Sequence, residues 1–202
     1  MNTTKKKQTS WLTYILWLGV IVLLFFTDLG TSLRAGIQGL ILGSGLKNAP
    51  TDQPAAAAKE SPVASEYPYQ LSLMTLDNKQ VSLSELKGKV VFLNQWATWC
   101  PPCRAEMPAI ERLYQSLDKQ KIAFVMLSLD EDPQTVRQAI QQKGFSFPVY
   151  TPASALPDDF ATQAIPTTLI LTRDGQIAQR IEGMANYDTD EFRRYLLSLY
   201  HP

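Results

Sequence analysis

The spacing of apolar residues around residue 75 is that of a β-hairpin. Leu71 and Leu73 alternate with polar residues, and the alternation resumes at Val81 and Leu83. Between these two stretches, residues 77–79 (Asp-Asn-Lys) have the composition of a tight turn. A period of two on both sides of a turn predicts two antiparallel strands.

Two longer segments are apolar at nearly every position. Residues 89–95 and 121–129 have the near-continuous runs that are typical of strands buried on both faces of a parallel sheet. Between them, Met107, Ile110 and Leu113 recur at helical spacing. These patterns predict two neighbouring buried strands that are connected by a helix.

Cap and turn residues mark the next elements. Asp132 followed by Pro133 predicts the start of a second helix, and Gly144 predicts its end. Residues 145–150 are expected to form a short strand, which Pro148 would place at an edge of the sheet.

The C-terminal part predicts a second hairpin and a last helix. A strand at 165–171 opens with a proline, residues 173–175 form a turn, and a strand follows at 176–182. Asp188 or Thr189 would cap the final helix. Parallel strands joined by helices and followed by a hairpin predict an α/β fold, with a mixed central β-sheet, helices on both faces and an extra N-terminal β-hairpin.

A stretch without charge lies near the N-terminus. Residues 11–26 would form a helix about 24 Å long, at the short end for a membrane span. Three lysines at residues 5–7 precede it, so the positive-inside tendency places the N-terminus in the cytoplasm. We expect a cytoplasmic segment at 1–10 and a single transmembrane signal anchor at 11–27. A cleaved signal peptide and a buried core helix are the alternatives.

The remaining boundaries follow from composition. Residues 47–66 are rich in Pro, Ala, Ser and Thr, which is typical of a linker. We expect residues 28–66 to form a juxtamembrane segment and linker that holds the next domain away from the bilayer. Residues 67–202 are long enough to form one domain with its own core. The chain has no basic stripe and no interleaving of basic and aromatic residues, so we expect no nucleic-acid partner.

Both cysteines lie where a predicted strand meets a predicted helix. If Cys100 is the N-cap, Cys103 lies on the same helix face and the two sulfurs can form a disulfide. Free N–H groups and the helix dipole would lower the pKa of the Cys100 thiol and make it the attacking nucleophile. Cys103, deeper in the first turn, would resolve the resulting mixed disulfide.

The two prolines between the cysteines indicate the direction of electron transfer. Pro101 and Pro102 remove two amides that could have stabilised the Cys100 thiolate. A dithiol whose thiolate is less stabilised is a better reductant. We therefore expect the pair to donate electrons rather than to oxidise its partner.

The stretch Trp96-Ala97-Thr98-Trp99-Cys100-Pro101-Pro102-Cys103 resembles the active-site signature of the thioredoxin superfamily. Residues 165–167 (Ile-Pro-Thr) before a strand strengthen the resemblance, which extends over about residues 67–200. The most similar branch is that of TlpA-like membrane-anchored thiol–disulfide oxidoreductases, which includes ResA-type and CcmG-type reductants of cytochrome c maturation.

The resemblance carries expectations about activity and location. It implies a thioredoxin-like fold, a redox-active disulfide in place of any cofactor, and a disulfide-containing envelope protein as substrate. It also implies a membrane or envelope thiol reductant that recycles the pair. The protein would be a single-pass protein of the bacterial inner membrane, with its catalytic domain facing the periplasm or the cell exterior.

The resemblance also assigns roles to individual residues. Pro166 matches the cis-proline of the family, whose neighbour Ile165 would pair with a substrate strand. Glu106 matches an acidic residue expected to transfer protons and tune the resolving thiol. Trp99 would offer apolar contact to a partner. Asn94 stands where thioredoxins have a buried aspartate, and it cannot take up a proton; the role of Gln95 stays open.

Two other classes of function remain as alternatives. A copper or zinc module of the same fold would need more ligands than two cysteines and His201, the only histidine. A peroxiredoxin-like antioxidant enzyme would share the fold but would place its nucleophile alone in a loop rich in Pro and Thr. Metal titration and a peroxide-consumption assay distinguish these classes from a thiol–disulfide oxidoreductase.

Overall fold

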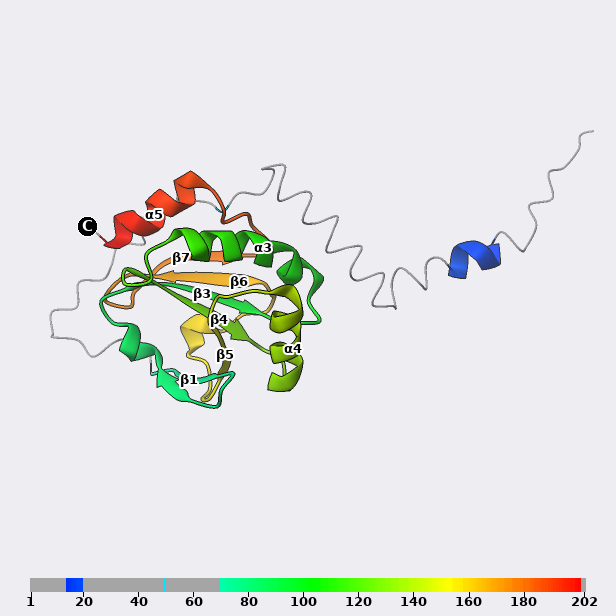
Figure 1. Ribbon diagram of the computed structural model, residues 1–202, viewed down its shortest axis with the longest axis horizontal. Helices are drawn as coiled ribbons and strands as arrows, with labels where there is room; N and C mark the ends of the chain where they lie inside the picture. The colour runs from blue at the N-terminus through cyan, green and yellow to red at the C-terminus, as the bar shows by residue number, and fades with distance from the viewer. Residues whose placement is uncertain (1–13, 20–48, 50–69, 201–202) are drawn as a thin grey trace, which may run out of the picture.

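The computed structural model describes residues 14–19, 49 and 70–200. Residues 70–200, the described domain, are built around a seven-stranded sheet with the strand order β2-β1-β5-β4-β3-β6-β7 (Figure 1). Its strands are β1 (Ser72–Thr75), β2 (Gln80–Ser82), β3 (Val90–Trp96), β4 (Ile122–Ser128), β5 (Val149–Pro152), β6 (Thr167–Leu171) and β7 (Ile177–Glu182). Its helices are α3 (Pro101–Ser116), α4 (Pro133–Lys143) and α5 (Asp190–Tyr200), together with the short 3-10 helices η1 (Leu83–Leu86) and η2 (Asp158–Phe160).

The sheet is mixed, as the sequence predicts. Strand β3 pairs in parallel with β4, and β4 pairs in parallel with β5. On the other side of β3, β6 and β7 follow in antiparallel orientation. The predicted N-terminal hairpin is confirmed as β1 and β2, which extend the sheet beyond β5. Every residue of β3 is buried, in agreement with its nearly continuous apolar run.

Helices α3, α4 and α5 contribute to the core on one face of the sheet, and the helices of the other face are the 3-10 helices η1 and η2, so the expectation of helices on both faces is only partly correct. One core cluster contains Ile110, Ile140 and Phe192, one residue from each of these helices. The cluster on the other face is closed by Leu83 of η1 and Phe160 of η2 and contains no α-helical residue. Crossovers between parallel strands are right-handed. In the sheet, β4 lies next to β3, and β5 lies next to β4 on the side away from β3. The two connections therefore run in the same direction across the sheet and place α3 and α4 on the same face (Figure 1).

Strand β5 corrects a second expectation. The sequence predicts an edge strand at 145–150 because of Pro148, but β5 begins after this proline and pairs on both sides, with β1 and β4. The carbonyl of Pro148 accepts a hydrogen bond from the N–H of Met126 at 3.2 Å. A proline that precedes a strand still supplies an acceptor, so it does not confine the strand to an edge.

Most of the N-terminal predictions lie outside the described residues. Of the predicted anchor at 11–27, residues 14–19 are described and are helical. No helix among residues 14–19 and 70–200 is both long and apolar enough to cross a membrane. The cytoplasmic segment at 1–10 is not among the described residues.

One residue of the predicted linker packs on the domain. Ala49 is buried in the core cluster that underlies α3 and α5. Its N–H donates a hydrogen bond to the carbonyl of Asn186 at 2.9 Å. The segment at 28–66 therefore touches the domain at Ala49.

Helix α4 begins and ends as predicted. The Asp132 side chain accepts hydrogen bonds from the N–H groups of Gln134 and Thr135, and Pro133 occupies the first helical position. Gly144 ends the helix in the left-handed conformation, with φ 68°. Its N–H returns to the carbonyls of the last turn, which satisfies acceptors that would otherwise have no partner.

Gly144→Ala is expected to lower the free energy of unfolding by about 1 kcal/mol, because an L-residue is strained in the left-handed region. The space around a Cβ atom at this position is open, so the strain comes from the backbone alone. Urea unfolding followed by circular dichroism measures the loss. Gly144→Asn is the matched control and should lose less, since Asn tolerates this conformation. Equal losses for the two variants would contradict this explanation.

Candidate active site

Cys100 and Cys103 form a disulfide at the junction of β3 and α3. Cys100 is the N-cap of α3, with Pro101 and Pro102 at the first helical positions, as the sequence predicts. The N–H of Cys103 donates to the Cys100 sulfur at 3.3 Å. Cys100 keeps 3% of its surface exposed and Cys103 none, so an incoming partner would meet Cys100 first.

The segment that contains Pro166 lies against this disulfide. The Ile165–Pro166 peptide bond is cis, as the resemblance implies. The carbonyl oxygen of Ile165 lies 3.7 Å from the sulfur of Cys100. Trp99, next to Cys100 in the chain, has 66% of its surface exposed. The structure therefore brings Cys100, Ile165 and Pro166 together, with a large apolar side chain at the adjoining surface.

Asp130, which sequence analysis missed, holds the loop before Cys100. Its carboxylate accepts hydrogen bonds from the N–H of Thr98 at 2.9 Å and from the Thr98 hydroxyl at 2.6 Å. The hydroxyl of Ser128 donates to the same carboxylate at 2.7 Å. Because β3 and β4 are parallel neighbours, their carboxyl ends meet at one edge of the sheet. The sequence predicts β3 and β4 as neighbouring strands, and this prediction could have identified the contact between Asp130 and Thr98.

Glu106 lies three residues after Cys103 in α3 and is fully buried. One carboxyl oxygen accepts a hydrogen bond from the side-chain amide of Asn94 at 2.8 Å, and the other accepts one from the N–H of Ala185 at 3.2 Å. Burial raises the pKa of the Glu106 carboxyl to about 8, although both hydrogen bonds act in the opposite direction. Glu106 is therefore mostly protonated at neutral pH.

Asn94 connects Glu106 to two further residues that sequence analysis missed. Its amide also donates to the hydroxyl of Thr168 at 2.9 Å, and this hydroxyl lies 2.8 Å from the hydroxyl of Tyr187. Asn94 and Thr168 are paired in the β3–β6 register. Burial, and then the nearby Glu106 carboxyl, raise the pKa of Tyr187 well above its usual value. At neutral pH the Glu106–Asn94–Thr168–Tyr187 chain is therefore largely uncharged.

Gln95 lies on the other face of the sheet and takes no part in this chain. Its side-chain amide donates to the carbonyl of Phe160 at 2.7 Å. Successive residues of a strand point to opposite faces, so Asn94 and Gln95 belong to different core layers. Gln95 thus ties η2 to the central strand.

The assembled groups are suited to thiol–disulfide chemistry. In the nearly buried disulfide only Cys100 keeps exposed surface, and a carboxyl with a pKa of about 8 follows Cys103 by one helical turn. Within the described ranges, no group of three or more His, Cys, Asp or Glu side chains is placed to hold a metal ion. Two thiols alone can carry the two electrons of a disulfide exchange.

Residues 50–196 match the family model described as Redoxin. The chain belongs to the Redoxin family. It is a TlpA-like member of the thioredoxin superfamily, and its reaction class is thiol–disulfide oxidoreduction.

Individual relatives agree with this assignment. Thiol-disulfide oxidoreductase ResA of Halalkalibacterium halodurans is 33% identical over 131 residues, which are 64% of this chain and 74% of the relative. Thioredoxin-like protein YneN of Bacillus subtilis is 39% identical over 108 residues, 52% of this chain and 64% of YneN, slightly less than two thirds of that relative. A crystal structure of a thioredoxin-family thiol:disulfide interchange protein from Chlorobium tepidum has a TM-score of 0.54 at 26% identity. It covers 68% of this chain and 99% of that protein.

The stability of the protein is expected to fall as pH rises from about 5.5 to about 7.5, at up to about 1.4 kcal/mol per pH unit. Folding raises the Glu106 pKa from 4.5 to about 8, so the folded chain keeps a proton that the unfolded chain has released. The stabilisation is therefore complete below the unfolded pKa and is lost as pH rises toward 8. Glu106→Gln should remove most of this slope in urea unfolding experiments.

Glu111→Gln is the matched control, because Glu111 is another largely buried carboxylate of α3. Burial opposes its ionisation, but hydrogen bonds from Ser146, Gln115 and Phe147 outweigh burial and lower its pKa. Glu111 is thus ionised in both states across this pH range, and its replacement should leave the slope unchanged. An equal slope in wild type and Glu106→Gln would show that Glu106 is not a buried neutral acid.

Proposed function

We propose that the protein is a membrane-anchored reductase of disulfides in envelope proteins. The observation that carries the proposal is the position of Cys100 at the cap of α3. Of the two cysteines, Cys100 alone keeps exposed surface, whereas Cys103 is fully buried. Such a pair is arranged for attack by one thiol and resolution by the other.

The reaction proceeds in two exchanges. The Cys100 thiolate attacks one sulfur of the substrate disulfide, forming a mixed disulfide, and the second substrate sulfur leaves as a thiolate that takes up a proton. The Cys103 thiolate then attacks the Cys100 sulfur, closing the Cys100–Cys103 disulfide, and the first substrate sulfur leaves and is protonated. Two electrons pass to the substrate, and a reducing partner must restore the dithiol.

Glu106 is suited to move the proton of Cys103. It lies at the i+3 position from this cysteine, on the same side of α3. With a pKa of about 8, Glu106 is ionised in a minority of molecules at neutral pH, and this carboxylate can accept the proton of the Cys103 thiol. The protonated acid, which is the major form, can return a proton when the disulfide opens. Asn94 and the N–H of Ala185 hold its carboxyl in place.

The structure of the N-cap of α3 supports electron transfer from the cysteine pair to the substrate. Pro101 and Pro102 have no N–H, and the N–H of Cys103, at 3.3 Å, is the backbone donor that reaches the Cys100 sulfur. A Cys100 thiolate with few donors is poorly stabilised, and this favours donation of electrons.

The sequence and the name of a relative support a proposed setting for the reaction. An uncharged stretch at residues 11–26 behind three lysines supports an N-terminal anchor with the domain outside the cytoplasm. ResA is the name of the relative that matches over most of its length. We therefore place the protein in the bacterial inner membrane, with a reduction step of cytochrome c maturation as the example of its task and an envelope or membrane thiol reductant as its recycling partner.

Cys103→Ser is expected to stop the reaction at the mixed disulfide, because the resolving thiol is absent. The reduced full-length variant, incubated with a disulfide-bonded protein such as oxidised insulin, should form a covalent adduct that dithiothreitol releases. Non-reducing electrophoresis and mass spectrometry would place the bond at Cys100.

Cys100→Ser is the matched control and should form far less adduct, since the remaining thiol is fully buried. Wild type should reduce insulin with no accumulated adduct. Multiple turnover by Cys103→Ser at the wild-type rate would contradict the two-thiol scheme. Equal adduct on both variants would contradict the assignment of Cys100 as the nucleophile.

A further inference from the structure

A pocket of about 270 Å³ lies between α3 and α4, beside the strand that leads to the cysteines. It includes none of Cys100, Glu106, Ile165 and Pro166. A cavity of about 150 Å³ lined by apolar side chains binds benzene. The pocket between α3 and α4 therefore has room for an aromatic side chain.

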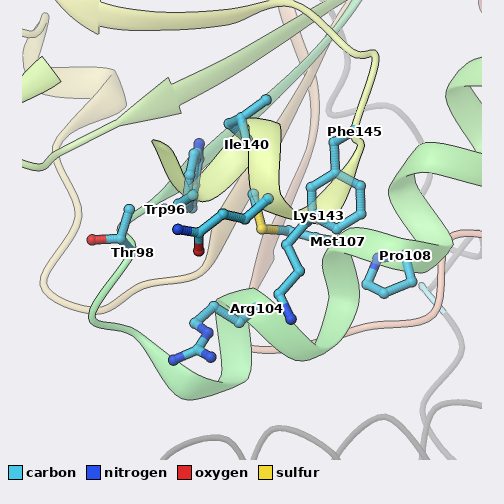
Figure 2. A pocket seen from close by; sticks show the side chains of 10 residues that line it. Trp96, Thr98, Arg104, Met107, Pro108, Ile140, Lys143 and Phe145 are labelled. Atoms are coloured by element: carbon cyan, nitrogen blue, oxygen red, sulfur yellow. The ribbon is translucent and has the colours of Figure 1, made fainter. Parts of the chain in front are cut away.

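The lining combines apolar walls with positive charge. Trp96, Met107, Ile140 and Phe145 supply apolar surface, whereas Arg104 and Lys143 are the charged residues of the lining. In Figure 2 the charged ends of Arg104 and Lys143 extend to the same side of the pocket, away from Trp96 and Ile140. Among the described residues that line this pocket there is no carboxylate, so the charge of this lining is complementary to an anion.

The pocket is close enough to Cys100 to be reached by a bound substrate chain. Thr98, which lines it, lies two residues before Cys100, and Arg104 lies one helical turn after it, about 6 Å along the axis. An extended chain advances about 3.3 Å per residue. A side chain roughly two to four residues from the substrate cysteine therefore spans this distance.

We propose that the pocket binds an aromatic side chain of the substrate polypeptide, next to a carboxylate that Arg104 and Lys143 attract. The proposal rests on the proposed function and adds to it a class of preferred substrate. Aromatic anchors in apolar pockets dominate binding energy, and charges at the rim add selectivity and rate of encounter. Substrates with an acidic residue beside an aromatic one, near the disulfide, are thus favoured over others.

Three cyclic peptides, each with one internal disulfide, test this preference. They carry Phe with Glu, Phe with Lys, or Ala with Gln at the same two positions, about three residues from the first cysteine. Reduced full-length wild type is mixed with excess peptide, quenched and alkylated, and the reduced peptide is measured by mass spectrometry. The Phe–Glu peptide should be reduced at least about tenfold faster than the Ala–Gln peptide, with the Phe–Lys peptide between them.

Two variants link the preference to the pocket. Ala139→Trp fills it and should reduce all three peptides at nearly equal rates, whereas Lys143→Glu, which leaves the lining without net charge, should reduce the Phe–Glu and Phe–Lys peptides at nearly equal rates and both faster than the Ala–Gln peptide. Lys79→Glu is the matched control, because Lys79 is an exposed lysine in the β1–β2 turn, and it should behave as wild type. All variants should reduce hydroxyethyl disulfide, a small neutral probe, at the wild-type rate.

The results distinguish a failure of the pocket proposal from a failure of the proposed function. If hydroxyethyl disulfide is reduced but wild type treats the three peptides alike, or Ala139→Trp keeps the preference, the pocket proposal is overturned and the proposed function stands. If wild type reduces no disulfide at all, the proposed function fails and the pocket proposal fails with it. A dimer in sedimentation that Ala139→Trp abolishes would assign the pocket to a second copy and overturn the proposal.

Discussion

The complete burial of β3 is the constraint on which the rest of the structure depends. Its side chains alternate between the two core layers, so the strand must be covered on both faces. Its carboxyl end emerges where α3 begins, and this places Cys100 at the cap of that helix. The same burial commits two polar residues, Asn94 and Gln95, to interior positions where each must find hydrogen-bond partners.

The hydrogen-bond partners of Asn94 form a largely uncharged network behind the cysteines. A carboxyl buried without a cation is stable in its protonated form, and the hydrogen bonds to Glu106 only partly offset the cost of ionisation. Thr168 and Tyr187 continue the network without adding charge, so the layer behind the cysteines stays neutral at physiological pH. A neutral acid in such a place can exchange a proton with a buried thiol, which an exposed carboxylate could not do as readily.

Short sequence patterns predicted the strand and the helix that carry the cysteines. They did not predict contacts between residues that are far apart in the chain. The cap at Cys100 and the hairpin β1–β2 follow from proline, turn and alternation patterns that extend over a few residues. Ala185 donates to Glu106 from 79 residues away in the chain, and no local pattern predicts such a contact. Tyr187 joins the network through the Thr168 hydroxyl, which is also a contact between distant residues. The placement of α3 and α4 on one face was also missed, because it depends on the order of the strands rather than on any single helix.

The proposed function requires that Cys100 and Cys103 form a reversible couple that donates electrons. Equilibration of the full-length protein with dithiothreitol buffers, with the thiols counted by alkylation and mass spectrometry, gives the reduction potential of this pair. We expect a reversible two-electron transition at or below about −270 mV, in the range of reducing thioredoxins. A potential near −120 mV, typical of a strong oxidant, or a pair that does not equilibrate with the buffer, would contradict it.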